Sequence, residues 1–137
     1  MKHPLTTVHI VLVEDNPADV YLVKRALREK GIEFVMTCFE DGEKALKALS
    51  GNGSEAPDII LLDLNLPKTD GVKVLETIRA IPELAGVPVG ILTSSESPSD
   101  MERTTVLGAA RYIKKPSTLD DFMREVGQGV ESMLLSG

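Results

Sequence analysis

The sequence predicts an α/β protein built on a five-stranded parallel sheet that is doubly wound, with helices on both of its faces. Short runs of branched apolar residues recur along the chain, and each run is too short for a helix. Stretches with the period and length of helices separate these runs. Strands that alternate with helices in this way are joined by right-handed crossovers, which make the sheet parallel. At 137 residues the chain suits one domain, and we expect residues 1–137 to form it without a second compact unit.

Five apolar runs predict the strands of this sheet. They are Ile10–Val13, Phe34–Phe39, Ile59–Leu62, Val87–Leu92 and Tyr112–Ile113. The run Phe34–Phe39 is the least typical, because Met and Cys have only a modest strand preference. Cys38 is the only cysteine, so the chain has no internal disulfide and no multi-cysteine metal site. We expect Cys38 to be buried within its strand.

Start and stop signals predict the helices between the strands. Asn16 is an expected N-cap before Pro17, and an amphipathic pattern continues to Lys30 and stops at Gly31. Comparable patterns predict helices over Gly42–Ser50, Val72–Ala80 and Pro98–Leu107, and a final helix from about Thr118. Ser97 and Gly108 bound the fourth helix as cap residues.

The final helix carries both a clear pattern and an interruption. Apolar residues recur at three- and four-residue steps, and Thr118 and Asp121 have the spacing of a capping box. Gly127 and Gly129 fall inside this pattern, where each costs roughly 1 kcal/mol relative to Ala. They mark a close helix contact, a bend or an early end of the helix, and the sequence leaves these alternatives open.

Composition excludes several classes of function. The formal net charge of -6 repels nucleic-acid phosphates, and five aromatic residues without Trp offer little surface for base stacking. The longest apolar runs are far shorter than the ~20 residues of a membrane helix, and no secretory signal is visible. We therefore expect a cytoplasmic protein that binds neither nucleic acid nor membrane.

The carboxyl ends of the predicted strands carry a coherent set of polar residues. Glu14 and Asp15 follow the first strand, Asp63 the third, Thr93 the fourth and Lys115 the fifth. Ligands of such sheets bind at these ends. Three carboxylates brought together repel one another by about 4 kcal/mol per pair at ~4 Å and an effective dielectric near 20. A cation is therefore expected, and oxygen ligands favour Mg2+, whereas zinc would require His or Cys.

Beside a divalent cation and a lysine, a carboxylate serves as a nucleophile toward a phosphoryl donor. Asp63 suits this role because it follows four apolar residues directly and so projects from a rigid strand end. Lys115 is placed to contact a phosphate oxygen, and the Thr93 hydroxyl to donate a hydrogen bond to another. Adjacent strand residues point to opposite faces, so we expect Lys114 to be a surface charge.

Five motifs together resemble the receiver family of two-component response regulators. They are Val-Glu-Asp-Asn at 13–16, Leu-Asp-Leu-Asn-Leu-Pro at 62–67, Asp-Gly at 70–71, Leu-Thr-Ser at 92–94 and Lys-Pro at 115–116. The resemblance implies a flavodoxin-like (βα)5 fold with strand order 2-1-3-4-5, one receiver domain and no output domain. Within the family, the amino-acid sequences of residues 13–19 and 62–68 are similar to those of the stand-alone regulators paired with bacterial phytochrome kinases.

The resemblance also implies roles for individual residues. Asp63 would be the phosphoacceptor, with Mg2+ bound by Glu14, Asp15, Asp63 and the backbone carbonyl of Asn65. Lys115 would contact the phosphate and precede a cis peptide bond at Pro116. Thr93 and Tyr112 would be the pair that move on activation, changing the surface of the fourth and fifth helices and the fifth strand. The implied partners are a sensor histidine kinase, of phytochrome type or otherwise, or a phosphotransfer protein, and a downstream protein target; homodimerisation stays open.

Two other functions use related features. A binding module with this fold would act without phosphorylation, but then the loss of Asp63, Lys115 or the acidic pair would be expected. Phosphohydrolases of the haloacid dehalogenase class also use an aspartate nucleophile, a lysine and acidic Mg2+ ligands. They carry a second Asp two positions later as general acid, whereas this chain has Asn65 there. We therefore expect a phosphoacceptor with self-phosphorylation and autodephosphorylation chemistry rather than an enzyme.

Overall fold

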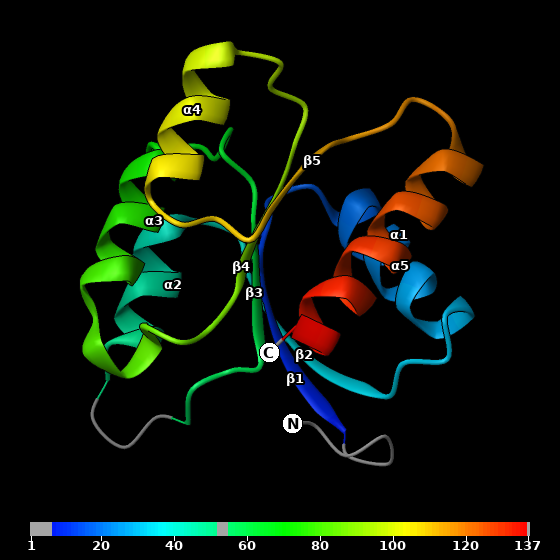
Figure 1. The fold of residues 1–137 in the computed structure, drawn as a ribbon, viewed down its shortest axis with the longest axis horizontal. Helices are drawn as coiled ribbons and strands as arrows, with labels where there is room; N and C mark the ends of the chain where they lie inside the picture. The colour runs from blue at the N-terminus through cyan, green and yellow to red at the C-terminus, as the bar shows by residue number, and fades with distance from the viewer. Residues whose placement is uncertain (1–6, 52–54, 137) are drawn as a thin grey trace.

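The computed structural model describes residues 7–51 and 55–136, and it contains the predicted parallel sheet (Figure 1). The strands are β1 Val8–Val13, β2 Phe34–Phe39, β3 Ile59–Leu62, β4 Val89–Thr93 and β5 Arg111–Lys114. All neighbouring pairs are parallel, and their order is β2-β1-β3-β4-β5. The flavodoxin-like strand order is therefore confirmed. Because β1 and β3 are adjacent, the residues that follow them lie side by side.

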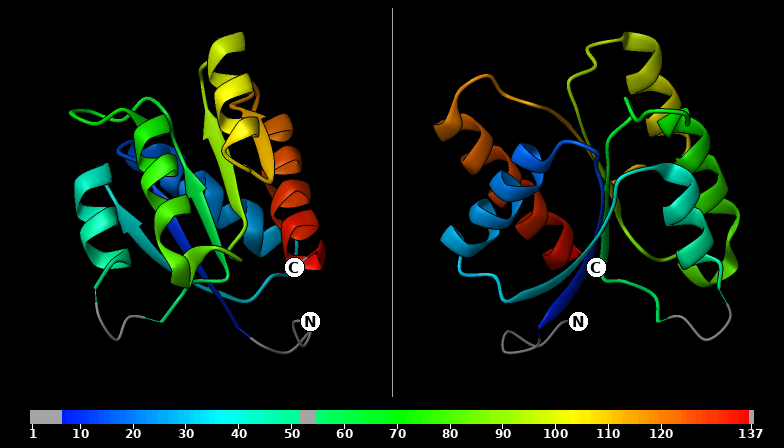
Figure 2. Two further views of the ribbon diagram at one scale, coloured as in Figure 1. Left: turned by 60° about the vertical axis from the view of Figure 1, so that its left-hand side comes forward. Right: turned by 180° about the vertical axis from the view of Figure 1, so that it is seen from behind.

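Helices cover both faces of the sheet, which confirms the doubly wound architecture. The helices are α1 Pro17–Glu29, α2 Gly42–Leu49, α3 Gly71–Ala80, α4 Pro98–Val106 and α5 Leu119–Ser136, with a short 3-10 helix η1 Pro82–Leu84. Helices α1 and α5 pack together on one face, and α2, α3 and α4 lie on the other (Figures 1 and 2). A separate apolar core fills the space between the sheet and each layer. Among the described helices, none is long and apolar enough to span a membrane.

The predicted caps start the helices at the expected residues. The Asn16 side chain accepts a hydrogen bond from the Ala18 amide at 2.9 Å, and Ser97 accepts one from the Asp100 amide at 3.3 Å. Thr118 accepts one from the Asp121 amide at 3.3 Å. These bonds satisfy amides of the first helical turn, which have no partner inside the helix.

The central strands hold the site rigidly because they are completely enclosed. Each residue of β3 has an exposed fraction of 0%. The ladder continues one step beyond the strands, since the Asp63 amide donates to the Val13 carbonyl at 3.1 Å and the Glu14 amide to the Phe39 carbonyl at 2.9 Å. The backbone of both acidic residues is thus fixed by the sheet.

Two expectations about local structure were wrong. Cys38 is exposed rather than buried. Strand β2 lies at the edge of the sheet and pairs only with β1, so its residues are less enclosed than those of β1, β3 and β4. Strand β4 begins at Val89 rather than Val87, because the Val87 amide donates to the Leu84 carbonyl in the turn after η1.

The structure also decides what the glycines of α5 do. The helix runs without interruption to Ser136, so it does not end early. A Cβ atom at Gly129 would lie 2.7 Å from Cδ1 of Ile113, which is far inside normal contact. Gly129 therefore permits a close approach between α5 and β5.

Candidate functional site

Three carboxylates from two adjacent strand ends form an acidic cluster. Glu14 and Asp15 follow β1 and Asp63 follows β3, and one ligand oxygen from each lies within 4.8 Å of the others. Glu14 and Asp63 are buried, with exposed fractions of 3% and 4%, whereas Asp15 is exposed. The three carboxylates that the sequence predicted to lie close together are therefore close together in the structure. Oxygen donors at this spacing suit one hard divalent cation.

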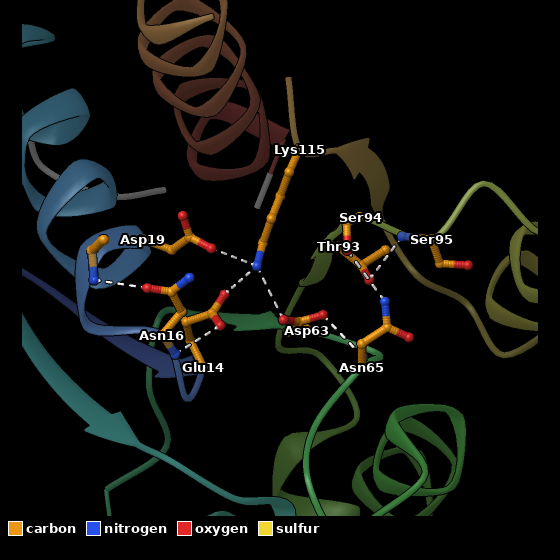
Figure 3. Close-up of polar contacts among 10 residues, drawn as sticks. Glu14, Asn16, Asp19, Asp63, Asn65, Thr93, Ser94, Ser95 and Lys115 are labelled. Carbon is orange, nitrogen blue, oxygen red and sulfur yellow. Dashed lines mark hydrogen bonds and ion pairs between the residues drawn. The ribbon is translucent and has the colours of Figure 1, made fainter. Parts of the chain in front are cut away.

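Lys115 reaches this cluster from the end of β5 (Figure 3). Its Nζ lies 2.7 Å from Asp19 Oδ2, 2.8 Å from Glu14 Oε1 and 3.1 Å from Asp63 Oδ2. The Lys115 amide donates to the Thr93 carbonyl at 2.8 Å, which fixes the start of the side chain. Lys114 points away, is exposed and pairs with Glu96, as expected for a surface charge. One lysine thus faces three carboxylates.

Burial and charge shift the pKa of two of these groups. The pKa of Glu14 is raised to about 7, mainly by burial and also by the Asp63 charge, against the lowering effect of contact with Lys115. Burial alone would lower the pKa of the Lys115 ammonium, but its contacts with Asp19 and Glu14 and the Asp63 charge outweigh this and raise it. The cluster therefore holds more negative charge than one lysine neutralises.

The donor set fits a bound cation. Among the described residues, the buried Glu14 Oε1 has the Lys115 ammonium at 2.8 Å as its partner, and Lys115 is shared with Asp19 and Asp63. A buried charge that is only partly compensated is costly unless another group neutralises it. A divalent cation bound by Glu14, Asp15 and Asp63 would supply the missing positive charge and would reduce their mutual repulsion.

The turn after β3 supports Asp63 and positions Asn65. The Asn65 amide donates to Asp63 Oδ1 at 2.9 Å, and the Asn65 side-chain amide donates to Ser94 Oγ at 3.4 Å. Gly71 packs directly under this turn, because a Cβ there would lie 2.4 Å from the Leu64 Cα. The predicted use of the Asn65 carbonyl as a metal ligand stays a prediction.

Thr93 and Tyr112 are linked through one residue, Ser95. Thr93 is fully buried at the end of β4, and its Oγ1 accepts a hydrogen bond from the Ser95 amide at 3.3 Å. The Tyr112 hydroxyl donates to the Ser95 carbonyl at 2.9 Å. The Ser95 hydroxyl in turn donates to Asp100 Oδ2 in α4 at 2.7 Å. A single residue therefore connects the site with β5 and α4.

Two residues at the site make contacts that the sequence did not predict. Asp19 was part of the motif at 13–19 but received no role, although it makes the shortest contact with Lys115. Its position in the first turn of α1 was the available signal, because that turn starts beside the end of β1. Ser95 stands in a Ser-rich loop, and nothing in its sequence pattern distinguishes it from Ser94.

The cis peptide bond expected before Pro116 is not found. The described residues contain no cis peptide bond, so that expectation was wrong. The trans form of such a bond is favoured by about 0.5–1 kcal/mol. Lys115 reaches its three carboxylates from the trans backbone.

Comparison with known proteins places this geometry in a family. The model of the response regulator receiver domain matches residues 10–127. The chain belongs to the response regulator receiver family. Response regulator Rcp1 of Synechocystis sp. is 39% identical over 130 residues, covering 92% of this receiver and 88% of Rcp1.

Solved structures agree with this assignment. The phosphorylated cyanobacterial phytochrome response regulator RcpA has a TM-score of 0.86 and 36% identity, covering 96% of each chain. The Mn(2+)-bound form of response regulator Rcp1 has a TM-score of 0.83 and 38% identity, covering 91% of this receiver and 92% of that chain. The family, the fold and the similarity to phytochrome-associated regulators, predicted from the motifs, are thus confirmed.

Proposed function

We propose that this receiver accepts a phosphoryl group on Asp63 from a histidine kinase and passes the phosphorylated state to a partner protein. The observation that carries the proposal is the position of Asp63. Its carboxylate is buried at the end of β3, belongs to the acidic cluster and lies 3.1 Å from the Lys115 ammonium. A nucleophile, a cation site and a fixed positive charge therefore converge on one point.

The transfer is a displacement at phosphorus. An Asp63 carboxylate oxygen forms a bond to phosphorus while the bond between phosphorus and the donor's imidazole nitrogen breaks. The electron pair of that bond stays on the imidazole nitrogen, which takes a proton from solvent. Lys115 stabilises charge on the transferring oxygens, and the Asn65 amide holds Asp63 Oδ1 in place.

Mg2+ is the proposed cofactor, and Glu14, Asp15 and Asp63 are the side chains that would hold it. When bound, the cation neutralises charge that develops on the phosphoryl oxygens. The related regulator Rcp1 has been solved in an Mn(2+)-bound form, and Mn2+ and Mg2+ accept the same oxygen ligands. The exposed Asp15 keeps the site open to solvent on one side.

The signal would leave the site through Thr93, Ser95 and Tyr112. A phosphoryl oxygen that accepts a hydrogen bond from the Thr93 hydroxyl would pull this side chain inward, and the hydrogen bond that the Ser95 amide donates to Thr93 Oγ1 would weaken. The Ser95 carbonyl holds Tyr112, so the surface of α4, β5 and α5 would change in response. Exposed Met101 in α4 and Leu119 at the start of α5 offer apolar contacts for a partner. We propose a shift between existing conformations rather than a new fold.

The proposed partners follow from this chemistry. A sensor histidine kinase or a phosphotransfer protein in the cytoplasm would supply the phosphoryl group, and a separate protein would receive the signal. The similarity to RcpA and Rcp1 favours a kinase of phytochrome type. As an alternative output, two phosphorylated copies of this receiver would form a homodimer through the surface of α4, β5 and α5.

Intact mass measurement after incubation with Mg2+ and acetyl phosphate tests the proposal. The native chain should gain one labile phosphoryl group, and the Asp63→Asn variant should gain none. Asp120→Asn, an exposed acid in the first turn of α5, is the matched control and should react like the native chain. A native chain without any adduct would favour a phosphorylation-independent binding module, and donor turnover without an adduct would favour a hydrolase.

A further inference from the structure

Of the three carboxylates that the described residues bring to Lys115, only Asp19 lies outside the acidic cluster. Among the described residues, the oxygens positioned for a shared cation come from Glu14, Asp15 and Asp63. Asp19 instead reaches across from α1 and contacts the Lys115 ammonium at 2.7 Å, the shortest of its three contacts. Figure 3 shows Asp19 and Asp63 on opposite sides of the ammonium.

A divalent cation in the cluster would compete with Lys115. A lysine ammonium has three N–H donors, and here it faces three carboxylates. Two of them, Glu14 and Asp63, are also the residues that a cation would bind. A bound cation would therefore withdraw charge from two partners of Lys115 and repel the ammonium itself. Asp19 is the partner that the cation leaves untouched.

The fold holds Asp19 in this place. It lies in the first turn of α1, where negatively charged side chains are favoured and where the Asn16 cap fixes the start of the helix. The helix is anchored by buried Val23, Ala26 and Leu27. The Asp19 and Lys115 side chains have exposed fractions of only 18% and 14%, so solvent screens their contact much less than it screens a surface ion pair.

We propose that Asp19 is a positioning residue that retains the Lys115 ammonium beside the acidic cluster when a divalent cation binds there. Without Asp19, the ammonium would keep only Glu14 and Asp63 as partners and would compete directly with the cation. With Asp19, the lysine and the cation occupy the site together, as phosphoryl transfer requires. The inference rests on the Mg2+ site of the proposed function and adds a residue to it.

A double-variant cycle measured by calorimetric titration with Mg2+ tests this role. Four chains are compared: native, Asp19→Asn, Lys115→Gln and the double variant. We expect Asp19→Asn to weaken Mg2+ binding by about tenfold, a coupling typical of neighbouring charges. Lys115→Gln should tighten binding because it removes the competing charge. In that background, Asp19→Asn should change the affinity by only about twofold.

The cycle separates positioning from a simple charge effect. If Asp19 acted only as a distant negative charge, Asp19→Asn would weaken Mg2+ binding equally in both backgrounds, and the proposal would be overturned. Asp19→Glu keeps a carboxylate and should restore much of the affinity. Glu43→Gln removes an exposed acid from the first turn of α2 and should leave the affinity unchanged.

A second measurement avoids the risk that Lys115→Gln does not fold. The NMR signal of the Lys115 ammonium is recorded during Mg2+ addition in the native chain and in Asp19→Asn. It should persist in the native chain and be lost to solvent exchange in the variant; the same response in both would contradict the proposal. Both experiments are done without a phosphodonor. If the native chain binds Mg2+ but the effects of the two substitutions simply add, only the role of Asp19 is refuted. If the native chain does not bind Mg2+, the proposed metal site and the role of Asp19 are both refuted.

Discussion

The two glycines of α5 allow the packing of α5 on β5 to be tested by paired substitutions. Gly127 and Gly129 are both buried in the same helix, so replacing either with Ala brings the same gain in helix propensity, about 1 kcal/mol. Their surroundings differ. The nearest atom to a Cβ at Gly127 would be the Ala26 carbonyl oxygen at 3.6 Å, whereas at Gly129 it would be Ile113 Cδ1 at 2.7 Å.

The expected free energies therefore have opposite signs. Gly127→Ala places a methyl group at ordinary contact distance and should stabilise the fold by about 1 kcal/mol. Gly129→Ala forces the buried Ile113 side chain to move, and overpacking of this kind typically costs about 1–3 kcal/mol. After the gain in propensity, the Gly129→Ala chain should be less stable than the native chain by about 1 kcal/mol.

Urea unfolding followed by circular dichroism measures these differences, since the chain has no Trp for fluorescence. The midpoints should move in opposite directions while the slope stays constant, which shows that stability and not the unfolded state has changed. Ile113→Val removes the clashing Cδ1 and supplies the matched rescue. Alone it should cost about 1 kcal/mol, but in the Gly129→Ala background it should cost nothing or restore stability. Equal stabilisation by Gly127→Ala and Gly129→Ala would refute the close approach of α5 to β5.

Two further predictions concern the site. Burial raises the pKa of Glu14 from 4.5 to about 7, so its stabilising protonated form is lost as pH rises through this window. In chelator-treated protein, loss of the proton from Glu14 should lower the free energy of unfolding by up to about 3 kcal/mol between pH 4.5 and 7. Urea unfolding at several pH values measures this change. A Glu14→Gln chain with the same pH dependence as the native chain would contradict it. Tyr112→Phe removes the donor to the Ser95 carbonyl and should lower stability by about 1 kcal/mol. It should also reduce the change in the α4 amide NMR signals on phosphorylation, and native-sized changes would exclude Tyr112 from the signal path.

Features that depend on short stretches of chain could be predicted from the sequence. The caps at Asn16, Ser97 and Thr118 act on amides two or three residues away, so their spacing alone identifies them. The acidic cluster was also predictable, because the strand order brings the ends of β1 and β3 together once the sheet is known to be parallel.

Features that depend on the position of one element against another were not predictable. The exposure of Cys38 follows from the edge position of β2, which the apolar character of its own run does not reveal. The contact between Asp19 and Lys115 joins residues 96 positions apart and depends on where the first turn of α1 lies relative to the loop after β5. Gly129 shows the same limit, since its small size is required by Ile113 on a different element.

The loss of one hydrogen bond provides enough free energy for the proposed signal, because Ser95 is hydrogen-bonded to three different residues. Its amide binds Thr93, its carbonyl accepts from Tyr112, and its hydroxyl donates to Asp100. Each such bond contributes about 0.5–1.5 kcal/mol net, and a change of about 1–2 kcal/mol alters a population ratio by about 5- to 30-fold. Loss of the hydrogen bond between the Ser95 amide and Thr93, caused by an inward movement of Thr93, is thus alone of the right size to bias the β4–α4 loop. The sheet, completely buried at β3, would stay unchanged while α4 and β5 respond.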